Sequence, residues 1–188
     1  MAPALGASDE EVREPLPGDE YVSEPQVTST RAVTIDAPVS EVWPWLVQIG
    51  QNRAGFYSYA WLENILGTHM TNAGRIVPEW QQLAAGDKVW LHPRVALTVL
   101  EVERERSIVL AEDWAFVLRP IGPDRTRFIV RGRGRFTFPD LKLPPLNFIY
   151  WRLLFEPGHF IMEQGMMRGI KRRAERLAAE RRVAEALA

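Results

Sequence analysis

The polar side chains that could do chemistry are few, and one pair of them has a spacing suited to proton transfer. His159 and Glu163 stand four residues apart in a run with helical periodicity, so they can touch across one helical turn. A buried histidine with a carboxylate can serve as acid and base in a dehydration or a cyclisation. The same spacing is common on exposed helix surfaces, where such a pair has no catalytic role. Other polar candidates are His92, Glu112 and Asp113.

Several other chemistries have no signature in this chain. It has no cysteine, so neither a disulfide nor a thiolate is available. The histidines, at 69, 92 and 159, are scattered without the spacing of metal ligands, and we predict no metal site and no cofactor. No phosphate-binding loop and no serine nucleophile motif is present. A formal net charge of -1 argues against whole-protein attraction to nucleic acid.

Hydrophobic periodicity orders the elements that would position these residues. An extended run through Ile35 is followed by Asp36 as a cap and by a short helix that begins near Pro38. From Lys88 onward the period is two, which predicts an antiparallel meander and, with the first strand, a sheet of six or seven strands. Pro157 then begins one long helix that continues to the end of the chain. The order predicts a single α+β domain over residues 27–185.

The strand at residues 125–136 has two chemically different faces. Five arginines and Ile129 share one parity, whereas Phe128, Val130 and glycines share the other. Burying five guanidinium groups without partners is prohibitive, so we expect the arginine face in water and the other face against the long helix. Gly132 and Gly134 then lie beneath that helix. They permit either a bulge or close packing, or they leave space for a cavity.

Aromatic side chains are concentrated in residues 51–64, QNRAGFYSYAWLEN. We predict a second short helix that follows Gly55 and ends near Gly67, so that its rings form two neighbouring stripes. The rings are either ordinary core or part of the wall of a ligand cavity. They are Phe56, Tyr57, Tyr59 and Trp61.

The predicted long helix has one inward stripe, and its methionines are polarizable and adaptable in shape. Such a surface suits a ligand of variable shape, although packing of the helix on its own sheet gives the same pattern. The stripe consists of Phe155, His159, Met162, Met166 and Ile170.

The N-terminal end of the chain and one internal segment stand apart in composition. Residues 1–26 carry seven acids and one arginine without hydrophobic period, and we expect them to be disordered or to lie loosely on the surface. We find no secretion signal and no membrane span, and expect a cytoplasmic protein. Residues 141–157 are strongly apolar, and they could be buried, form a gate over a cavity or contact a membrane transiently.

Three runs carry a family resemblance: VTIDAPVSEVWPWL, QIGQNRAGFYSYAWLEN and NAGRIVPEWQQLAAGDKVWL. Together with the order of elements, they resemble the START-like or SRPBCC superfamily, in particular a bacterial subgroup of unassigned function. The resemblance implies a helix-grip fold, in which a curved antiparallel sheet wraps around a long C-terminal helix and two short helices follow the first strand. Members of this superfamily hold lipids, sterols, plant hormones or polyketides; some are cyclases or dehydratases, and others are co-chaperones.

The resemblance implies binding, or transport, of a hydrophobic small molecule or lipid in a cavity between the sheet and the C-terminal helix. We expect no nucleic-acid partner, because the arginine face lacks the interleaved aromatic side chains that single-strand binding uses. One alternative is an enzyme similar to polyketide cyclases or dehydratases, with His92 or His159 and Glu163 as acid and base. Another is a co-chaperone-like interaction domain that uses residues 141–157. Residues predicted to line the cavity are Phe56, Tyr57, Trp61, Trp90, Trp114, Phe128, Gly132, Gly134, His159, Met162 and Met166.

Overall fold

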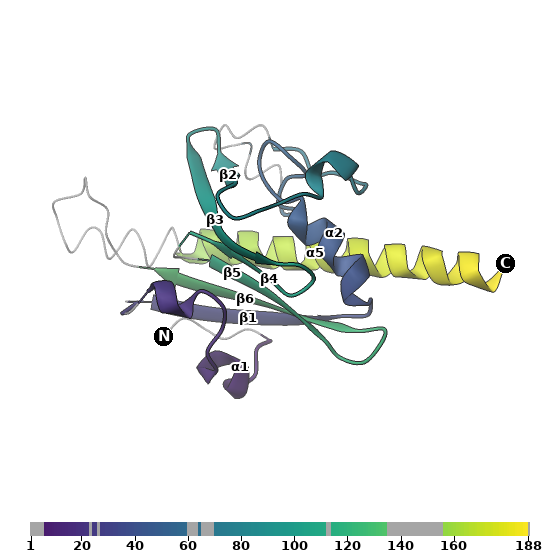
Figure 1. Ribbon diagram of the computed structural model, residues 1–188, viewed down its shortest axis with the longest axis horizontal. Coiled ribbons are helices and arrows are strands. Elements are labelled where there is room, and N and C mark those ends of the chain that lie inside the picture. The colour runs from purple at the N-terminus through teal and green to yellow at the C-terminus, as the bar shows by residue number, and fades with distance from the viewer. Residues whose placement is uncertain are drawn as a thin grey trace.

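A computed structural model describes residues 6–22, 24–25, 27–59, 64, 70–111, 114–134 and 156–187. One antiparallel sheet and a long C-terminal helix dominate the described part (Figure 1). The strands are β1 Val27–Ile35, β2 Lys88–His92, β3 Val95–Glu103, β4 Ser107–Leu110, β5 Trp114–Pro120 and β6 Thr126–Gly134. The helices include α1 Asp9–Arg13, α2 Val39–Val47 and α5 Glu156–Ala186, with 3₁₀ turns η1 Asp19–Tyr21 and η2 Pro78–Trp80.

The sheet has the order β1-β6-β5-β4-β3-β2, so β1 and β2 are its two edges. Strands β2 to β6 form the predicted meander, and β6 pairs with β1 from Val27 opposite Gly134 to Ile35 opposite Thr126. Register shifts within β2–β3 and β3–β4 mark bulges, which increase the local bend of a sheet. The curved six-stranded sheet and α5 confirm the predicted α+β helix-grip fold.

Helix α2 is short, as its prolines require. Pro38 occupies the N-cap position and makes no side-chain cap, so the predicted cap at Asp36 is wrong. Pro44 lies inside the helix and cannot donate a backbone hydrogen bond, and α2 ends three residues later at Val47. Apolar side chains of α2 are buried as the pattern predicts, and the helix packs against α5.

The inner face of the sheet is the one that meets α5. Register places Ile35 of β1 and Phe128 of β6 on this face, and both are fully buried. Phe116 of β5 packs beside Phe128 with their ring centroids 6.2 Å apart. The side of α5 that faces the sheet is buried through Met166 and Ile170, which completes one continuous core.

The arginine face of β6 is covered at Arg131 and Arg133, so the prediction that it lies in water is wrong there, whereas Arg125 is exposed. Arg131 and Arg133 are only 3% and 4% exposed. Residues 6–22, which we expected to be disordered or loosely attached, lie against this face, and the α1 segment is seen beside β1 and β6 in Figure 1. The Asp19 carboxylate accepts hydrogen bonds from both Arg131 and Arg133. Because these cations have partners, the penalty on which the prediction rested is offset.

Two further contacts fix the N-terminal segment. The Glu11 carboxylate accepts two hydrogen bonds from Arg127, at 2.7 and 2.8 Å. Leu16 is buried and forms a second, smaller core on the outer face of the sheet with Ala32, Val117 and Ile129. The segment is therefore held by apolar burial as well as by charge.

Two sequence predictions fall largely or wholly on residues outside the described ones. These are most of the second short helix expected between Gly55 and Gly67, and the apolar segment 141–157 apart from its last two residues. Of the described helices, none combines the length and the apolar character that a membrane crossing requires.

Candidate functional site

An ion pair lies buried between the sheet and α5. Arg31 of β1 donates through Nη1 to Glu163 Oε1 of α5 at 2.7 Å, and the two side chains are 2% and 1% exposed. The same Nη1 lies 3.4 Å from Ser29 Oγ. Strand alternation places Ser29 and Arg31 on the same face as Ile35, and helical spacing places Glu163 on the buried stripe of α5. Local periodicity thus brings both charges into the interior.

The Arg31 guanidinium also contacts an aromatic ring and carries a buried donor, Nε–H, without an acceptor among the described residues. The ring of Phe160 lies over the group, with the Arg31 Cζ atom 5.0 Å from the ring centroid. Arg31 Nε is buried and has no acceptor among the residues that the structure describes. Buried donors in proteins are nearly always paired with protein or water. A further acceptor, from water or from a ligand, would complete the site.

Packing on the inner face changes along its length. Toward α2 the face is closed, and Ile35, Phe128 and Val130 are fully buried. Toward the other end of β6, Gly132 and its β5 partner Trp114 retain exposed surface. On α5, Phe160 and Met162 are likewise partly exposed at that end. The ion pair lies at the transition between the closed end and the partly exposed end.

An aromatic group borders the partly exposed end. Phe56 stacks on Trp114 with ring centroids 6.4 Å apart, and Trp114 contacts Phe116 at 4.8 Å. Trp114 and Gly132 are direct partners in the β5–β6 ladder, so Trp114 links Phe56 to the glycine strand. Three residues that the sequence predicted as cavity lining, Phe56, Trp114 and Gly132, are thus brought together.

The loop that carries Phe56 is not the helix that the sequence predicted. Residues 56–59 are irregular, and Gly55 and Tyr57 both have positive φ, of 72° and 57°, which interrupts a right-handed helix. The backbone N–H of Tyr57 donates to Asn72 Oδ1 at 2.7 Å instead of to a preceding carbonyl. The expected helical stripes of rings in 56–59 are therefore wrong. Tyr59 is 39% exposed, and Trp61 lies outside the described residues.

Tyr57 is a core residue held by polar contacts. Its hydroxyl accepts a hydrogen bond from Gln48 Nε2 at 2.7 Å, and the Arg173 guanidinium lies over its ring at 4.5 Å. Burial raises the pKa of Tyr57 to about 12, although the Gln48 hydrogen bond works in the opposite direction. A side chain on Gly169 would overlap the Tyr57 carbonyl oxygen. Tyr57 thus fixes the loop against α5, and its predicted role toward a ligand stays a prediction.

The histidine candidates are not joined to the ion pair by the described contacts. His92 ends the edge strand β2, and its Nδ1 accepts from the backbone N–H of Arg94 at 3.2 Å. Since β1 is the opposite edge of the sheet, His92 and Arg31 belong to different ends of the strand order. His159 lies on α5, but its side chain is outside the described part, as are Glu112 and Asp113. The proposed pairing of His159 with Glu163 stays a prediction.

The remaining predicted lining residues occupy different environments. Phe128 and Met166 are buried in the core, Trp90 is half-buried on the edge strand β2, and Gly134 ends β6 opposite Val27.

Arg31, in contrast, was missed by the sequence reasoning. Its signal was present, because Arg31 shares its strand parity with the apolar Val33 and Ile35.

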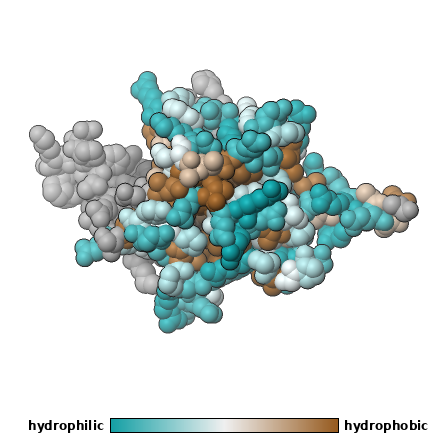
Figure 2. All heavy atoms as spheres, viewed as in Figure 1, coloured by the Kyte–Doolittle hydropathy of each residue, from teal (hydrophilic) through white to brown (hydrophobic). Residues whose placement is uncertain are grey.

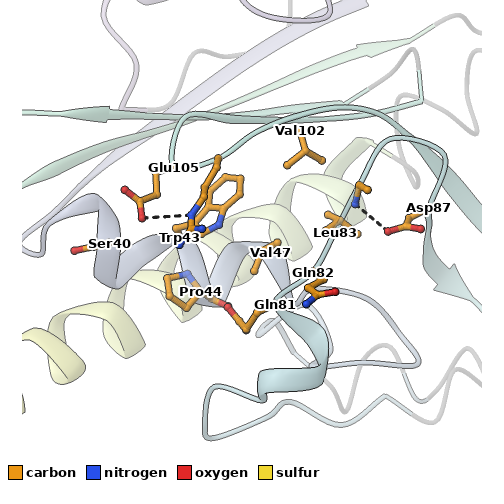
Figure 3. A pocket seen from close by; sticks show the side chains of 12 residues that line it. Ser40, Trp43, Pro44, Val47, Gln81, Gln82, Leu83, Asp87, Val102 and Glu105 are labelled. Carbon is orange, nitrogen blue, oxygen red and sulfur yellow. Dashed lines mark hydrogen bonds and ion pairs between the residues drawn. The ribbon is translucent and has the colours of Figure 1, made fainter.

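A separate hollow of about 700 Å³ lies outside the space between the inner face and α5. Its apolar part comes from Trp43, Pro44 and Val47 of α2 with Leu83 and Val102 (Figure 3), and Arg104 and Glu105 also line it. Figure 2, in the same view as Figure 1, shows hydrophobic side chains gathered near the middle of the molecule. Of the predicted lining residues that the structure describes, none borders this hollow.

The curved sheet and α5 define a helix-grip protein. No protein-family model matches the chain, and neither does any curated protein sequence. Two solved structures are similar in the course of the chain. The polyketide-cyclase-like protein Cgl2372 of Corynebacterium glutamicum is 13% identical over 87% of this chain and 95% of that chain, with a TM-score of 0.36. CalU16 of Micromonospora echinospora is 19% identical over 79% and 83%, with a TM-score of 0.30. The helix-grip assignment therefore rests on the sheet order and on α5.

Proposed function

We propose that the protein binds an apolar small molecule between α5 and the inner face of the sheet. The observation that carries this proposal is the change from full burial at Phe128 to partial exposure at Trp114 and Gly132 on one continuous face. Apolar surface that a ligand removes from water at this end would supply affinity. A small number of polar groups at such a site would fix the orientation of the ligand.

The buried ion pair supports a functional site more than it supports stability. Removing two charges from water is costly, and apolar residues of similar volume often stabilise a protein as well or better. Arg31 and Glu163 lie where the closed core gives way to partly exposed aromatic side chains. At this place the pair can meet the polar end of a bound molecule while the aromatic group contacts its apolar part.

The first experiment asks whether an apolar molecule occupies this space. Purified protein is analysed by native mass spectrometry and solvent extraction, and then titrated with the uncharged fluorescent probe phenylnaphthylamine. Gly132→Leu places a bulky side chain on the inner face, where a Cβ would lie 3.0 Å from Ser29 Oγ. We expect this change to weaken probe binding by about tenfold or more, which corresponds to about 1.4 kcal/mol.

Gly74→Leu is the matched control, because a Cβ at Gly74 meets no other atom within 4 Å. It introduces the same side chain at an open position and should leave binding unchanged. Absence of any co-purifying apolar molecule together with absence of probe binding would refute the proposal. Equal affinities of the two variants would place the bound probe elsewhere, for example in the hollow beside α2.

A further inference from the structure

We propose that the outer face of β1, β5 and β6 is a docking surface for an acidic peptide segment of a partner protein. The N-terminal segment, residues 6–22, occupies this surface within the same chain. The inference is independent of the proposed function, which concerns the opposite face of the sheet. It follows from the charge of the outer face, from the polypeptide groups that this face binds and from the way the N-terminal segment is attached.

The outer face favours an anionic partner because its arginines lie close together. Arg119 of β5 is directly opposite Arg127 of β6 in the ladder, and like charges in opposite positions repel each other. Arg131 and Arg133 follow on the same side of β6. Without carboxylates from the N-terminal segment the arginines repel one another, so the face favours an acidic replacement. The carboxylates that pair with these arginines belong to Glu11, Glu14 and Asp19.

The contacts of Arg131 indicate that the favoured anion is a polypeptide. Its Nη1 donates to the backbone carbonyl of Glu14 at 2.9 Å, and its Nη2 donates to the carbonyls of Glu11 and Val12 at 2.6 and 3.1 Å. A phosphate chain supplies anions, but it lacks main-chain carbonyls and an aliphatic anchor. Arginine clusters that bind acidic motifs are a recurring mode of peptide recognition. The aliphatic anchor is Leu16, which packs against Ala32, Val117 and Ile129.

Gly18 adds a requirement of shape. Its φ is 85°, a left-handed conformation that glycine adopts without strain. A Cβ at this position would lie 2.7 Å from Val109 Cγ1 and 2.8 Å from Arg133 Nη2. The pattern that the face recognises is therefore an aliphatic anchor, a glycine and an acid in close succession, as in Leu16, Gly18 and Asp19.

The N-terminal segment can leave the outer face without breaking the sheet. The backbone hydrogen bonds described for the segment close within it, as from the Asp19 N–H to the Leu16 carbonyl. The ladder of β1 with β6 does not involve the segment. Its paired carboxylates are 13–29% exposed, and such ion pairs separate at lower cost than fully buried ones. A partner segment with the same groups can replace these contacts, but it must overcome the effective concentration of the tethered segment.

A fluorescein-labelled peptide with the sequence of residues 6–22 tests whether the outer face accepts such a segment from another molecule. The full-length variant Leu16→Ala with Asp19→Ala weakens the attachment within the chain and leaves every residue of the face intact. We expect this variant to bind the peptide at least about tenfold more tightly than the native protein does, because the native segment competes at an effective concentration in the millimolar range. Urea unfolding checks that the variant is folded, and fluorescence anisotropy measures binding.

A peptide with Gly18→Ala is the matched control, because it keeps every charge while its added methyl group overlaps the face. It should bind the variant about tenfold more weakly than the native-sequence peptide does. Equal affinities of the two peptides would reduce the attraction to non-specific charge and overturn the inference. An oligothymidylate of similar net charge that binds as tightly as the native-sequence peptide would assign the face to nucleic acid instead.

Asp19→Asn is the second variant should the double substitution fail to fold, since the amide keeps the shape of the side chain and removes its charge. It should raise the affinity for the native-sequence peptide about threefold over that of the native protein, the range of one partly exposed ion pair. If folded variants bind the peptide no more tightly than the native protein does, the N-terminal segment is a fixed part of the fold and the outer face is not a docking surface.

Discussion

Arginines lie on both faces of the β1–β6 pair, but their surroundings differ. On the outer face, Arg131 donates to Asp19 and to the backbone carbonyls of Glu11, Val12 and Glu14. On the inner face, Arg31 has one carboxylate partner and one buried nitrogen with no acceptor among the described residues. The outer guanidinium is fully engaged by the chain itself, whereas the inner one is not.

This difference suggests two uses of buried charge. On the outer face the charged groups hold the structure together, and on the inner face we propose that they serve binding. At Arg131 every guanidinium nitrogen has an acceptor within the chain, and satisfied polar groups of this kind make a structure rigid and join residues 6–22 to the sheet. A buried network with unmatched polar groups lowers the free energy of unfolding, so the fold alone gives no reason to keep it. The inner pair lies where the inner face becomes partly exposed, which is why we propose a role for it in ligand binding.

The largest effect is expected from breaking the inner pair. Glu163→Leu leaves Arg31 buried without its carboxylate and should reduce the free energy of unfolding by about 3–5 kcal/mol. The double change Arg31→Met with Glu163→Leu should return stability to within about 1 kcal/mol of the native protein, or above it. Urea unfolding of the three proteins measures both steps. If the double variant is as unstable as the single one, the pair is a structural element and the contrast between the two faces is lost.

A smaller effect is expected on the outer face. Asp19→Ala removes the shared partner of Arg131 and Arg133 and should cost about 2 kcal/mol, less than a fully buried pair because the Asp19 side chain is 29% exposed. Binding at the inner site should not change. Glu20→Ala, at an exposed neighbouring position, is the control in urea unfolding and should have little effect. Equal stabilities of the two variants would show that the N-terminal segment adds nothing to the fold.

Much of the fold could be predicted from the alternation and the helical spacing of apolar residues, because these determine which face of a strand or helix a side chain occupies. Alternation in β6 placed Phe128 and Val130 against the long helix, and Pro157 marked the start of that helix. What covers the other face depends on pairing between distant residues. Glu11 and Arg127 are 116 positions apart, and composition shows only that one region is acidic and another basic. The sequence therefore revealed the acidic segment and the arginine face separately, and did not predict that they contact each other.

The candidate site was predicted less completely than the fold. Glu163 was found because it stands four residues after His159, at helical spacing, and its partner was therefore sought in that histidine on the same helix. Arg31 comes from a strand 132 positions away and could only be matched once the sheet was built. Tyr57 shows the same limit: its positive φ and the close approach of Gly169 arise from tertiary contacts, which override the helical spacing of the rings.

The smallest expected effect is the stability that the outer face loses at acid pH, when Glu11 is protonated. Hydrogen bonds from Arg127 lower the pKa of Glu11 below its ordinary value of 4.5, although burial opposes them. A carboxyl with a lower pKa in the folded state stabilises the fold fully above the ordinary value, and this contribution is lost as pH falls through the lower, folded-state pKa. Because the pair is partly exposed, the loss should be about 1 kcal/mol or less.

Urea unfolding from neutral pH to about pH 3 would measure this contribution. Glu11→Gln should lower stability at neutral pH and make the acid-dependent decline shallower, because the amide keeps the shape of the side chain without its titration. A decline with the same slope in both proteins would assign the acid sensitivity to other carboxyls. It would also show that the outer network is held by its backbone acceptors and by Leu16, with the charge of Glu11 contributing little.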